Sequence, residues 1–249
     1  MKIKRKSHKP TTSFKDNHVI LVEGFGDVDF FAKFFQLTLG QTQADDIILF
    51  DDEHCGTIRN RLYLERQGGE PSVQTRLKDP DTGILRKKEF FTFDTPKSLF
   101  VIVDSDGDVD ARFKEYQKIF KESACNIQID APNKVVTQEI EDETVDFGIF
   151  VIGDKENTFK DLETFVLANR TKTTPEYEAI VNQFISQCEN LEPQPQYLQS
   201  KSKVAVYLAS MPKWRNSIGD ALNEEAYFRI DYTQFDFLKA LVKYFSPTP

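Results

Sequence analysis

The stretch FVIVDSDGDVDARFKE, residues 100–115, decides the expected fold of this 249-residue chain. It begins with an apolar run of the kind that forms a buried strand, and residues 109–120 then show helical periodicity. Between the two lie four aspartates on alternate positions: Asp104, Asp106, Asp108 and Asp110. The stretch therefore predicts a buried strand, an acidic turn at its carboxyl end and a helix.

The alternating aspartates first suggest two other kinds of site. In an EF-hand calcium loop they would occupy positions 1, 3, 5 and 7, with Glu115 at position 12. That loop needs glycine at position 6, where Val109 stands, and it follows a helix rather than a strand. An aspartyl phosphotransferase of the haloacid dehalogenase kind also has Asp-x-Asp after a strand, but normally after the first strand of the chain. Here the strand is the third apolar one, which favours a metal site completed by other segments.

Strand and helix patterns alternate along the chain as far as about residue 170. Strands are predicted at 18–22, 47–51, 98–104, 133–140 and 147–153, and helices at 27–39, 56–66 and 109–120. Glycines, prolines and the turn Pro80-Asp81-Thr82-Gly83 predict a β-hairpin between residues 68 and 93. Further helices are predicted at 176–190, 197–211 and 233–245.

This order of elements predicts an α/β fold with a mostly parallel sheet flanked by helices. We expect a basic N-terminal segment (1–17) and an α/β domain (18–170) that carries the β-hairpin insertion at about 56–95. A helical C-terminal extension (171–249) follows.

Positive charge is concentrated in two segments of a chain whose net charge is −8. Residues 1–18 hold six Lys and Arg against one acid, and residues 59–88 hold eight against four. A basic rim around an acidic, cation-filled centre suits an enzyme that acts on a polyanion, although a solvated surface with uneven charge is the alternative. The predicted nucleic-acid contacts are Lys4, Arg5, Lys6, Arg59, Arg61, Arg66, Arg76, Arg86, Lys87 and Lys88.

The three cysteines and the hydropathy pattern exclude several classes of protein. Cys55, Cys125 and Cys188 are widely spaced and form no C-x-x-C pair, so neither a disulfide framework nor a cysteine zinc site is expected. The sequence has no apolar run of about 18 residues and no signal-peptide pattern at its start. We therefore expect a cytoplasmic protein that does not contact a membrane.

Acidic residues follow three of the predicted strands. They form three pairs: Glu23 with Asp27, Asp104 with Asp106, and Asp161 with Glu163. Ligands of open α/β sheets gather at the carboxyl ends of strands, so the six carboxylates are expected to converge. Without cations their mutual repulsion would raise their pKa values and oppose folding, which favours hard divalent ions.

Some of these acids also have a structural interpretation. Asp27 lies where acids favour the helix dipole, and Thr158-x-x-Asp161 could be a capping box before an apolar helix. Asp108 and Asp110 are expected to be acids at a helix N-terminus rather than metal ligands.

Four segments together resemble a known family. They are VEGFGDVDFF, IVDSDGD, FGIFVIGDKENTFKDLETFVL and KSKVAVYLAS. The V-E-G and D-x-D-G patterns are similar to the Toprim domain of topoisomerases, primases, recombination proteins and nucleases of the overcoming-lysogenization-defect type. The combination resembles a small stand-alone Toprim-like family of bacterial proteins. The resemblance covers roughly residues 18–170 and extends into the helical tail.

This resemblance implies a Toprim-like, Rossmannoid fold and a two-metal nuclease that acts on DNA or RNA with Mg²⁺ or Mn²⁺. The implied metal ligands are Glu23, Asp27, Asp104, Asp106, Asp161 and Glu163, and Glu23 could instead be a general base. Lys203 is the expected lysine beside the reacting phosphate, with Lys201 as the alternative.

The resemblance also suggests a role in phage defence or DNA repair. The partner would be a separate ATPase, because this chain has no G-x-x-x-x-G-K-[ST] loop of its own. A topoisomerase would need a nucleophilic tyrosine in a further domain, and a primase would need a zinc module. A non-catalytic Toprim-like module that binds nucleic acid or protein is the rival interpretation.

Overall fold

A computed structural model of the chain describes most of its residues. The described residues are 2–6, 15, 17–39, 46–50, 62–66, 70–79, 83–86, 95–171, 175–191, 198–210, 217–222 and 228–246. No helix among them is both long enough and apolar enough to cross a lipid bilayer.

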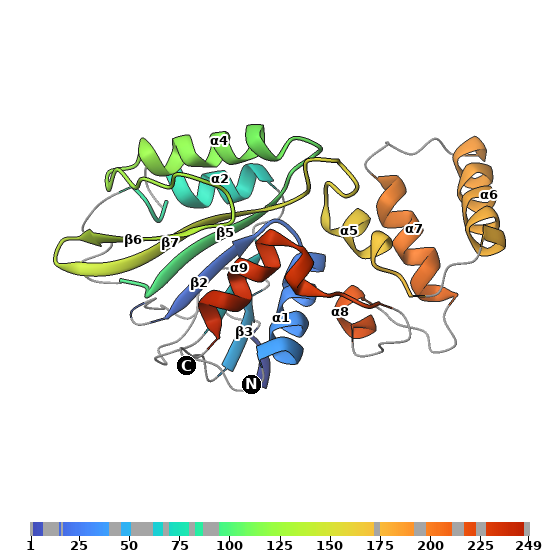
Figure 1. The fold of residues 1–249 in the computed structure, drawn as a ribbon, viewed down its shortest axis with the longest axis horizontal. Coiled ribbons are helices and arrows are strands. Elements are labelled where there is room, and N and C mark those ends of the chain that lie inside the picture. Colours follow the sequence, from blue (N-terminus) through green and yellow to red (C-terminus); the bar gives the residue numbers. More distant parts are fainter. Residues whose placement is uncertain are drawn as a thin grey trace.

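One seven-stranded sheet organises the chain (Figure 1). In sheet order the strands are β1 (Lys2–Lys6), β3 (Asp46–Phe50), β4 (Leu62–Arg66), β2 (His18–Val22), β5 (Ser98–Asp104), β7 (Glu143–Ile152) and β6 (Val135–Ile140). All neighbours are parallel except β6 and β7, which are antiparallel. The predicted α/β fold with a mostly parallel sheet is therefore confirmed.

The order of the strands reverses at β2. From β2 the chain passes through helix α1 (Phe25–Leu39) to β3 and β4 on one side, whereas β5 lies on the other side of β2. In open α/β sheets the crevice that binds ligands forms at such a switch point, outside the carboxyl ends of the two strands. The topology therefore marks the ends of β2 and β5 as the place for a functional site.

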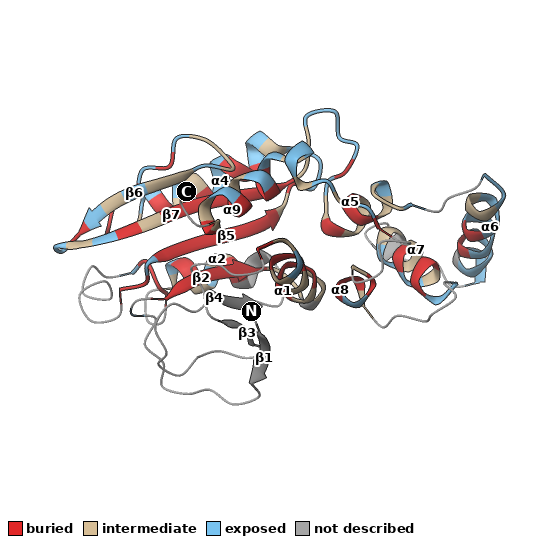
Figure 2. Ribbon diagram, turned by 60° about the horizontal axis from the view of Figure 1, so that its bottom comes forward, coloured by how far each residue is buried: buried red, intermediate tan, exposed pale blue. Residues whose placement is uncertain are grey.

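Helices cover both faces of the sheet. Helices α1 and α9 (Asp236–Phe245) lie on one face, and α2 (Glu70–Lys78) and α4 (Val109–Lys121) on the other (Figure 1). All five residues of β2 are buried, as expected for a strand covered on both faces. Figure 2 shows this burial along β2, β5 and much of β7.

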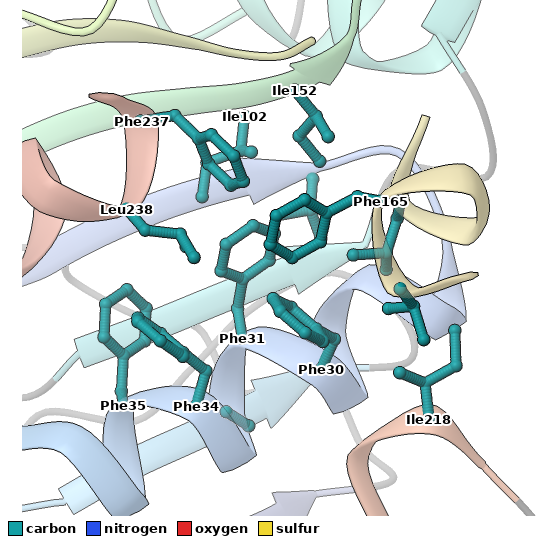
Figure 3. Packing of buried hydrophobic residues seen from close by; sticks show 14 of the residues in the cluster. Phe30, Phe31, Phe34, Phe35, Ile102, Ile152, Phe165, Ile218, Phe237 and Leu238 are labelled. Atoms are coloured by element: carbon teal, nitrogen blue, oxygen red, sulfur yellow. The ribbon is translucent and has the colours of Figure 1, made fainter. Parts of the chain in front are cut away.

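Aromatic packing joins α1 to helix α5 (Leu162–Ala168) and to α9. Phe30, Phe31, Phe34 and Phe35 project from α1 toward Phe165 and the start of α9 (Figure 3). Ring centroids of Phe30 and Phe165 are 6.0 Å apart, and those of Phe165 and Phe237 are 5.3 Å apart. The phenylalanines of this cluster therefore fix α5 beside α1, which positions the acids at the start of both helices.

Two predictions in the inserted region are wrong. Residues 62–66 of the predicted helix 56–66 form β4, which is hydrogen-bonded between β3 and β2, so open strand edges override the local helical pattern. The first arm of the predicted hairpin contains helix α2 instead. Val73 and Leu77, four residues apart, are both buried, and Pro71 lies in the first helical turn, where proline is tolerated.

The N-terminal segment adds a strand to the sheet, and the C-terminal segment adds helices that pack on its core. The basic N-terminal segment supplies the edge strand β1. The predicted C-terminal helices are confirmed as α6 (Pro175–Leu191), α7 (Leu198–Ala209) and α9, with short helices α8 (Ile218–Ala221) and η1 (Tyr232–Gln234) between them. Helix α9 buries Phe237, Leu238 and Leu241 against the sheet, so the end of the C-terminal segment is part of the main core.

A polar network holds the end of α9 on the sheet. The Tyr244 hydroxyl donates to Asp146 Oδ2 over 2.8 Å, and Thr137 Oγ1 donates to Asp146 Oδ1 over 2.6 Å. His18 lies beside it, with Nδ1 3.0 Å from Ser98 Oγ, and burial lowers the pKa of His18 to about 4. A neutral His18 and the hydrogen-bonded Asp146 therefore mark the end of the sheet opposite the carboxyl ends of β2 and β5.

We predict that Tyr244→Phe lowers the free energy of unfolding by about 1–2 kcal/mol, because the Asp146 carboxylate loses a charge-assisted hydrogen bond. Urea denaturation measures the change. Tyr232→Phe is the matched control, since Tyr232 packs on the same core and its hydroxyl makes no hydrogen bond with a described residue. Equal losses in the two variants would contradict a role for the Tyr244–Asp146 bond.

Candidate metal centre

Two acids meet where β2 and β5 end. Glu23 directly follows β2, and Asp104 is the last residue of β5. The Asp104 backbone N–H donates to Glu23 Oε1 over 3.2 Å. The parallel pairing of the two strands thus brings together residues that are 81 positions apart in the chain.

The loop that leads into α5 closes over the same point. Ser105 N donates to the carbonyl oxygens of Ile152 and Lys160, each over 3.0 Å. The N–H of Leu162, the first residue of α5, donates to Asp104 Oδ1 over 3.1 Å. These bonds place the start of α5, with Asp161 and Glu163, beside Asp104.

The fifth acid comes from the first turn of α1. Asp27 Oδ2 accepts a hydrogen bond from Gly24 N over 2.6 Å, so Asp27 also caps the turn between β2 and α1. The negative charges of Asp27, Glu23, Glu163 and Asp161 all act on the ionisation of Asp104. Five of the six predicted metal ligands therefore lie close enough to influence one another, and the charge of the sixth, Asp106, also acts on Glu23.

The ionisation of these acids is strongly perturbed. Withdrawal from water raises the pKa of Glu23 to about 7 and the pKa of Asp27 to about 7. Burial, reinforced by the neighbouring acids, raises the pKa of Asp104 well above its usual value, and burial also raises the pKa of Glu163. A cation among these carboxylates would favour their charged forms and relieve the repulsion.

The sixth predicted ligand, Asp106, is directed toward an arginine. Asp106 has a φ of 51° and Gly107 a φ of 98°, which turn the chain sharply after β5. The Asp106 carboxylate makes an ion pair with Arg112 of α4, whose side chain is 9% exposed. Arg112 Nε also donates to the Asp104 carbonyl oxygen over 3.0 Å. Asp106 is thus held at the margin of the acidic group.

Sequence reasoning did not assign a role to Arg112. The sequence does show a single arginine, Arg112, among the acidic residues at the start of α4, eight residues after Asp104. That spacing lets the guanidinium reach back from the helix to the preceding turn.

The lysine beside the acids is Lys201 rather than Lys203. Lys201 Nζ lies 3.9 Å from Glu163 Oε1, and its charge also acts on Asp27. Lys201 and Lys203 are two positions apart on α7, which corresponds to a rotation of about 200° around the helix axis. Their side chains therefore lie on nearly opposite sides of the helix and cannot both face one site. The contact with Glu163 therefore favours Lys201, the alternative from the sequence, as the lysine near the acids.

Two acids cap helix starts, and a third lies in a first helical turn. Asp161 Oδ1 accepts from Thr164 N over 2.7 Å, so the capping box of α5 joins Asp161 with Thr164 instead of Thr158 with Asp161. Asp108 Oδ1 accepts from Ala111 N over 2.8 Å at the start of α4, and Asp110 lies in its first turn. The prediction that Asp108 and Asp110 are helix N-terminal acids is confirmed.

The carboxylates of the acidic site suit a hard divalent ion, but their side chains are not arranged around a common point. Among the described residues no three His, Cys, Asp or Glu side chains form a ready metal-binding group. Asp27, Asp104 and Asp161 each direct one oxygen to a backbone N–H. Carboxylate oxygens are the ligands that Mg²⁺ and Mn²⁺ prefer, and rotation of these side chains would be needed to bring them together around an ion.

The predicted basic surface is described only in part. Arg76 lies in α2, and Arg86 lines a cavity of about 620 Å³ between α2 and α4 together with Lys78 and Lys118. For Lys4, Arg5 and Lys6 on β1 and for Arg66 on β4, the structure describes the backbone alone. Arg59, Arg61, Lys87 and Lys88 lie outside the described residues.

Comparison with protein families assigns the chain to a family of unknown function. The sequence profile of the family described as "Protein of unknown function (DUF3226)" matches residues 17–246. No curated protein and no solved structure matches the chain.

We predict that Glu23→Gln stabilises the metal-free protein at pH 8. The raised pKa of Glu23 means that the folded state binds more protons than the unfolded state between about pH 4.5 and 7, so its contribution to stability is lost as the pH rises through about 7. Glutamine keeps the acceptor for Asp104 N and removes the charge. In EDTA the variant should gain about 2–3 kcal/mol over wild type at pH 8 and little at pH 4.

Asp106→Asn serves as the control in these denaturation curves, because Asp106 is already paired with Arg112. It should give no gain at pH 8. A Glu23→Gln variant that is less stable than wild type at both pH values would contradict the buried-charge interpretation.

Proposed function

The chain belongs to the DUF3226 family, and we propose that it is a divalent-metal-dependent nuclease that hydrolyses phosphodiester bonds in DNA or RNA. The observation that supports this most is the convergence of five carboxylates at the switch point of a mostly parallel sheet. We also propose that the sheet is Toprim-like, on the basis of the V-E-G and D-x-D-G motifs at the ends of β2 and β5.

We propose that the site holds two ions, either Mg²⁺ or Mn²⁺. The residues that would hold them follow three strands of the sheet. They are Glu23, Asp27, Asp104, Asp161 and Glu163, with Asp106 joining if Arg112 releases it. Ions bound there would supply an activated water nucleophile and would stabilise the leaving oxygen.

The neighbouring cations have separate tasks in this proposal. Arg112 holds the main chain of Asp104 and the Asp106 carboxylate, so it is a positioning residue. Lys201 stands beside Glu163, and its ammonium is available to neutralise charge that develops on the scissile phosphate. The wider part of the proposal, a role in phage defence or DNA repair beside a separate ATPase, rests on the family resemblance of the motifs.

The test is a cleavage assay on single-stranded DNA, double-stranded DNA and RNA with Mg²⁺, Mn²⁺ or EDTA. We expect metal-dependent cleavage that falls at least ~10²-fold in Glu23→Gln and in Asp104→Asn, because each removes a proposed ligand from the site. Asp142→Asn is the matched control, since Asp142 is an exposed acid in the turn between β6 and β7, outside the five-acid group.

Thermal unfolding gives a second readout. Mg²⁺ or Mn²⁺ should raise the melting temperature of wild type and of Asp142→Asn, but not that of Glu23→Gln. If wild type binds nucleic acid without cleaving it and shows no metal-dependent stabilisation, the non-catalytic module is favoured and the nuclease proposal is wrong.

A further prediction separates the two lysines of α7. Lys201→Ala should lower kcat by about 10²-fold, because it removes the ammonium beside Glu163, whereas Lys203→Ala should leave kcat unchanged. Single-turnover cleavage of the preferred substrate measures both. The reverse order of effects would return the catalytic role to Lys203.

A further inference from the structure

A groove of about 1050 Å³ runs between α9, residues 131–134 and residues 153–159. We propose that this groove binds a single-stranded segment of nucleic acid and leads it to the acidic site. The class of ligand rests on the proposed nuclease function. The location and the preference for a single strand come from the residues that line the groove.

Two segments that line the groove continue along the chain into the acidic site. The loop 153–159 lines the groove, and the same loop continues to Asp161 at the start of α5. Val109 and Asp110 in the first turn of α4 also line it, directly after the turn that carries Asp104 and Asp106. The Lys160 carbonyl oxygen accepts from Ser105 N and from Asp106 N over 3.0 and 3.1 Å, which ties the two segments together. A strand in the groove would therefore reach the acids without leaving the protein surface.

Four exposed lysines line the groove: Lys134, Lys155, Lys239 and Lys243. None of them makes an ion pair with a residue that the structure describes. Lys239 and Lys243 are one helical turn apart on α9, so their ammonium groups can hold neighbouring phosphates. Unpaired cations along a groove are what a phosphodiester backbone requires.

The acids of the groove are concentrated near the proposed metal site. Asp110, Asp154 and Glu156 line the end formed by α4 and the loop after β7, and the Asp154 carboxylate accepts from Thr158 N over 2.7 Å. The remaining acid, Asp236, lies in the first turn of α9. Lys243 lies farther along the sheet, because its neighbour Tyr244 bonds to Asp146, well before the end of β7. The lysines of α9 therefore extend away from the acidic end.

An aromatic ring favours an unpaired strand. Phe235 lines the groove and is only half-buried, and the rings of Phe165 and Phe159 contact it edge-on at centroid distances of 4.8 and 5.7 Å. A ring held in this way offers a stacking surface to a base, which must be unstacked from a duplex to reach it. Pockets for drug-sized ligands reach about 1,000 Å³, so this groove has room for more than one nucleotide.

The test measures binding without cleavage. Fluorescence anisotropy follows a labelled oligothymidylate of about 12 nucleotides in EDTA, over about 50 to 200 mM salt. Lys239→Glu/Lys243→Glu should weaken binding at least ~10-fold and reduce its salt dependence. The matched control is Lys114→Glu/Lys121→Glu, which makes the same charge change at exposed positions of α4 on the opposite face of the sheet. This control should bind like wild type. Phe235→Leu keeps an apolar side chain but removes the ring, so it should weaken binding.

Two outcomes would overturn the groove assignment: wild-type affinity in the α9 variant, or an equal loss in the α4 control. Tighter binding of the matching duplex than of the single strand would overturn the proposed strand preference. Failure of the nuclease proposal can be told apart from failure of the groove assignment, because this assay measures binding alone. Glu23→Gln, which should abolish cleavage, should bind the oligonucleotide like wild type. A wild-type protein that binds through α9 but never cleaves would contradict the catalytic function and support the groove.

Discussion

The parallel pairing of β2 with β5 is the constraint on which the candidate site depends. Since both strands run in the same direction, their carboxyl ends deliver Glu23 and Asp104 to one place, and the Asp104 N–H bonds to the Glu23 carboxylate. The reversal of strand order at β2 leaves this place open for a ligand. Helix α5 completes the arrangement because the Leu162 N–H bonds to Asp104.

The acidic site opposes the stability of the protein that carries it. Burial raises the pKa of Glu23 and Asp27 to about 7, so their ionisation at neutral pH destabilises the fold. The aromatic cluster of α1, α5 and α9 offsets this penalty with extensive apolar burial and keeps the acids in place. Arg112 and Lys201 each compensate part of the negative charge, from α4 and α7 respectively.

Helix α9 connects the core with the surface. Its inner face, with Phe237, Leu238 and Leu241, packs on the sheet, and Tyr244 bonds to Asp146 at its far end. Its outer face presents Lys239 and Lys243 to the groove. Because its inner face is fixed on the sheet, α9 can hold a flexible polyanion on its outer face in a defined direction relative to the acids. In our proposals the groove and the acidic site therefore form one functional surface.

The sequence by itself determined the elements whose spacing of apolar residues reflects their burial. These are the strands 18–22 and 98–104, the helix after each strand, and the acids at the strand ends. Tertiary structure decided the rest. Residues 62–66 became a strand because β2 and β3 offered open edges, which periodicity within one segment does not record. Likewise, the position of Lys201 beside Glu163 and the contacts of Arg112 depend on how α7 and α4 are oriented, since a helix presents each side chain in only one direction.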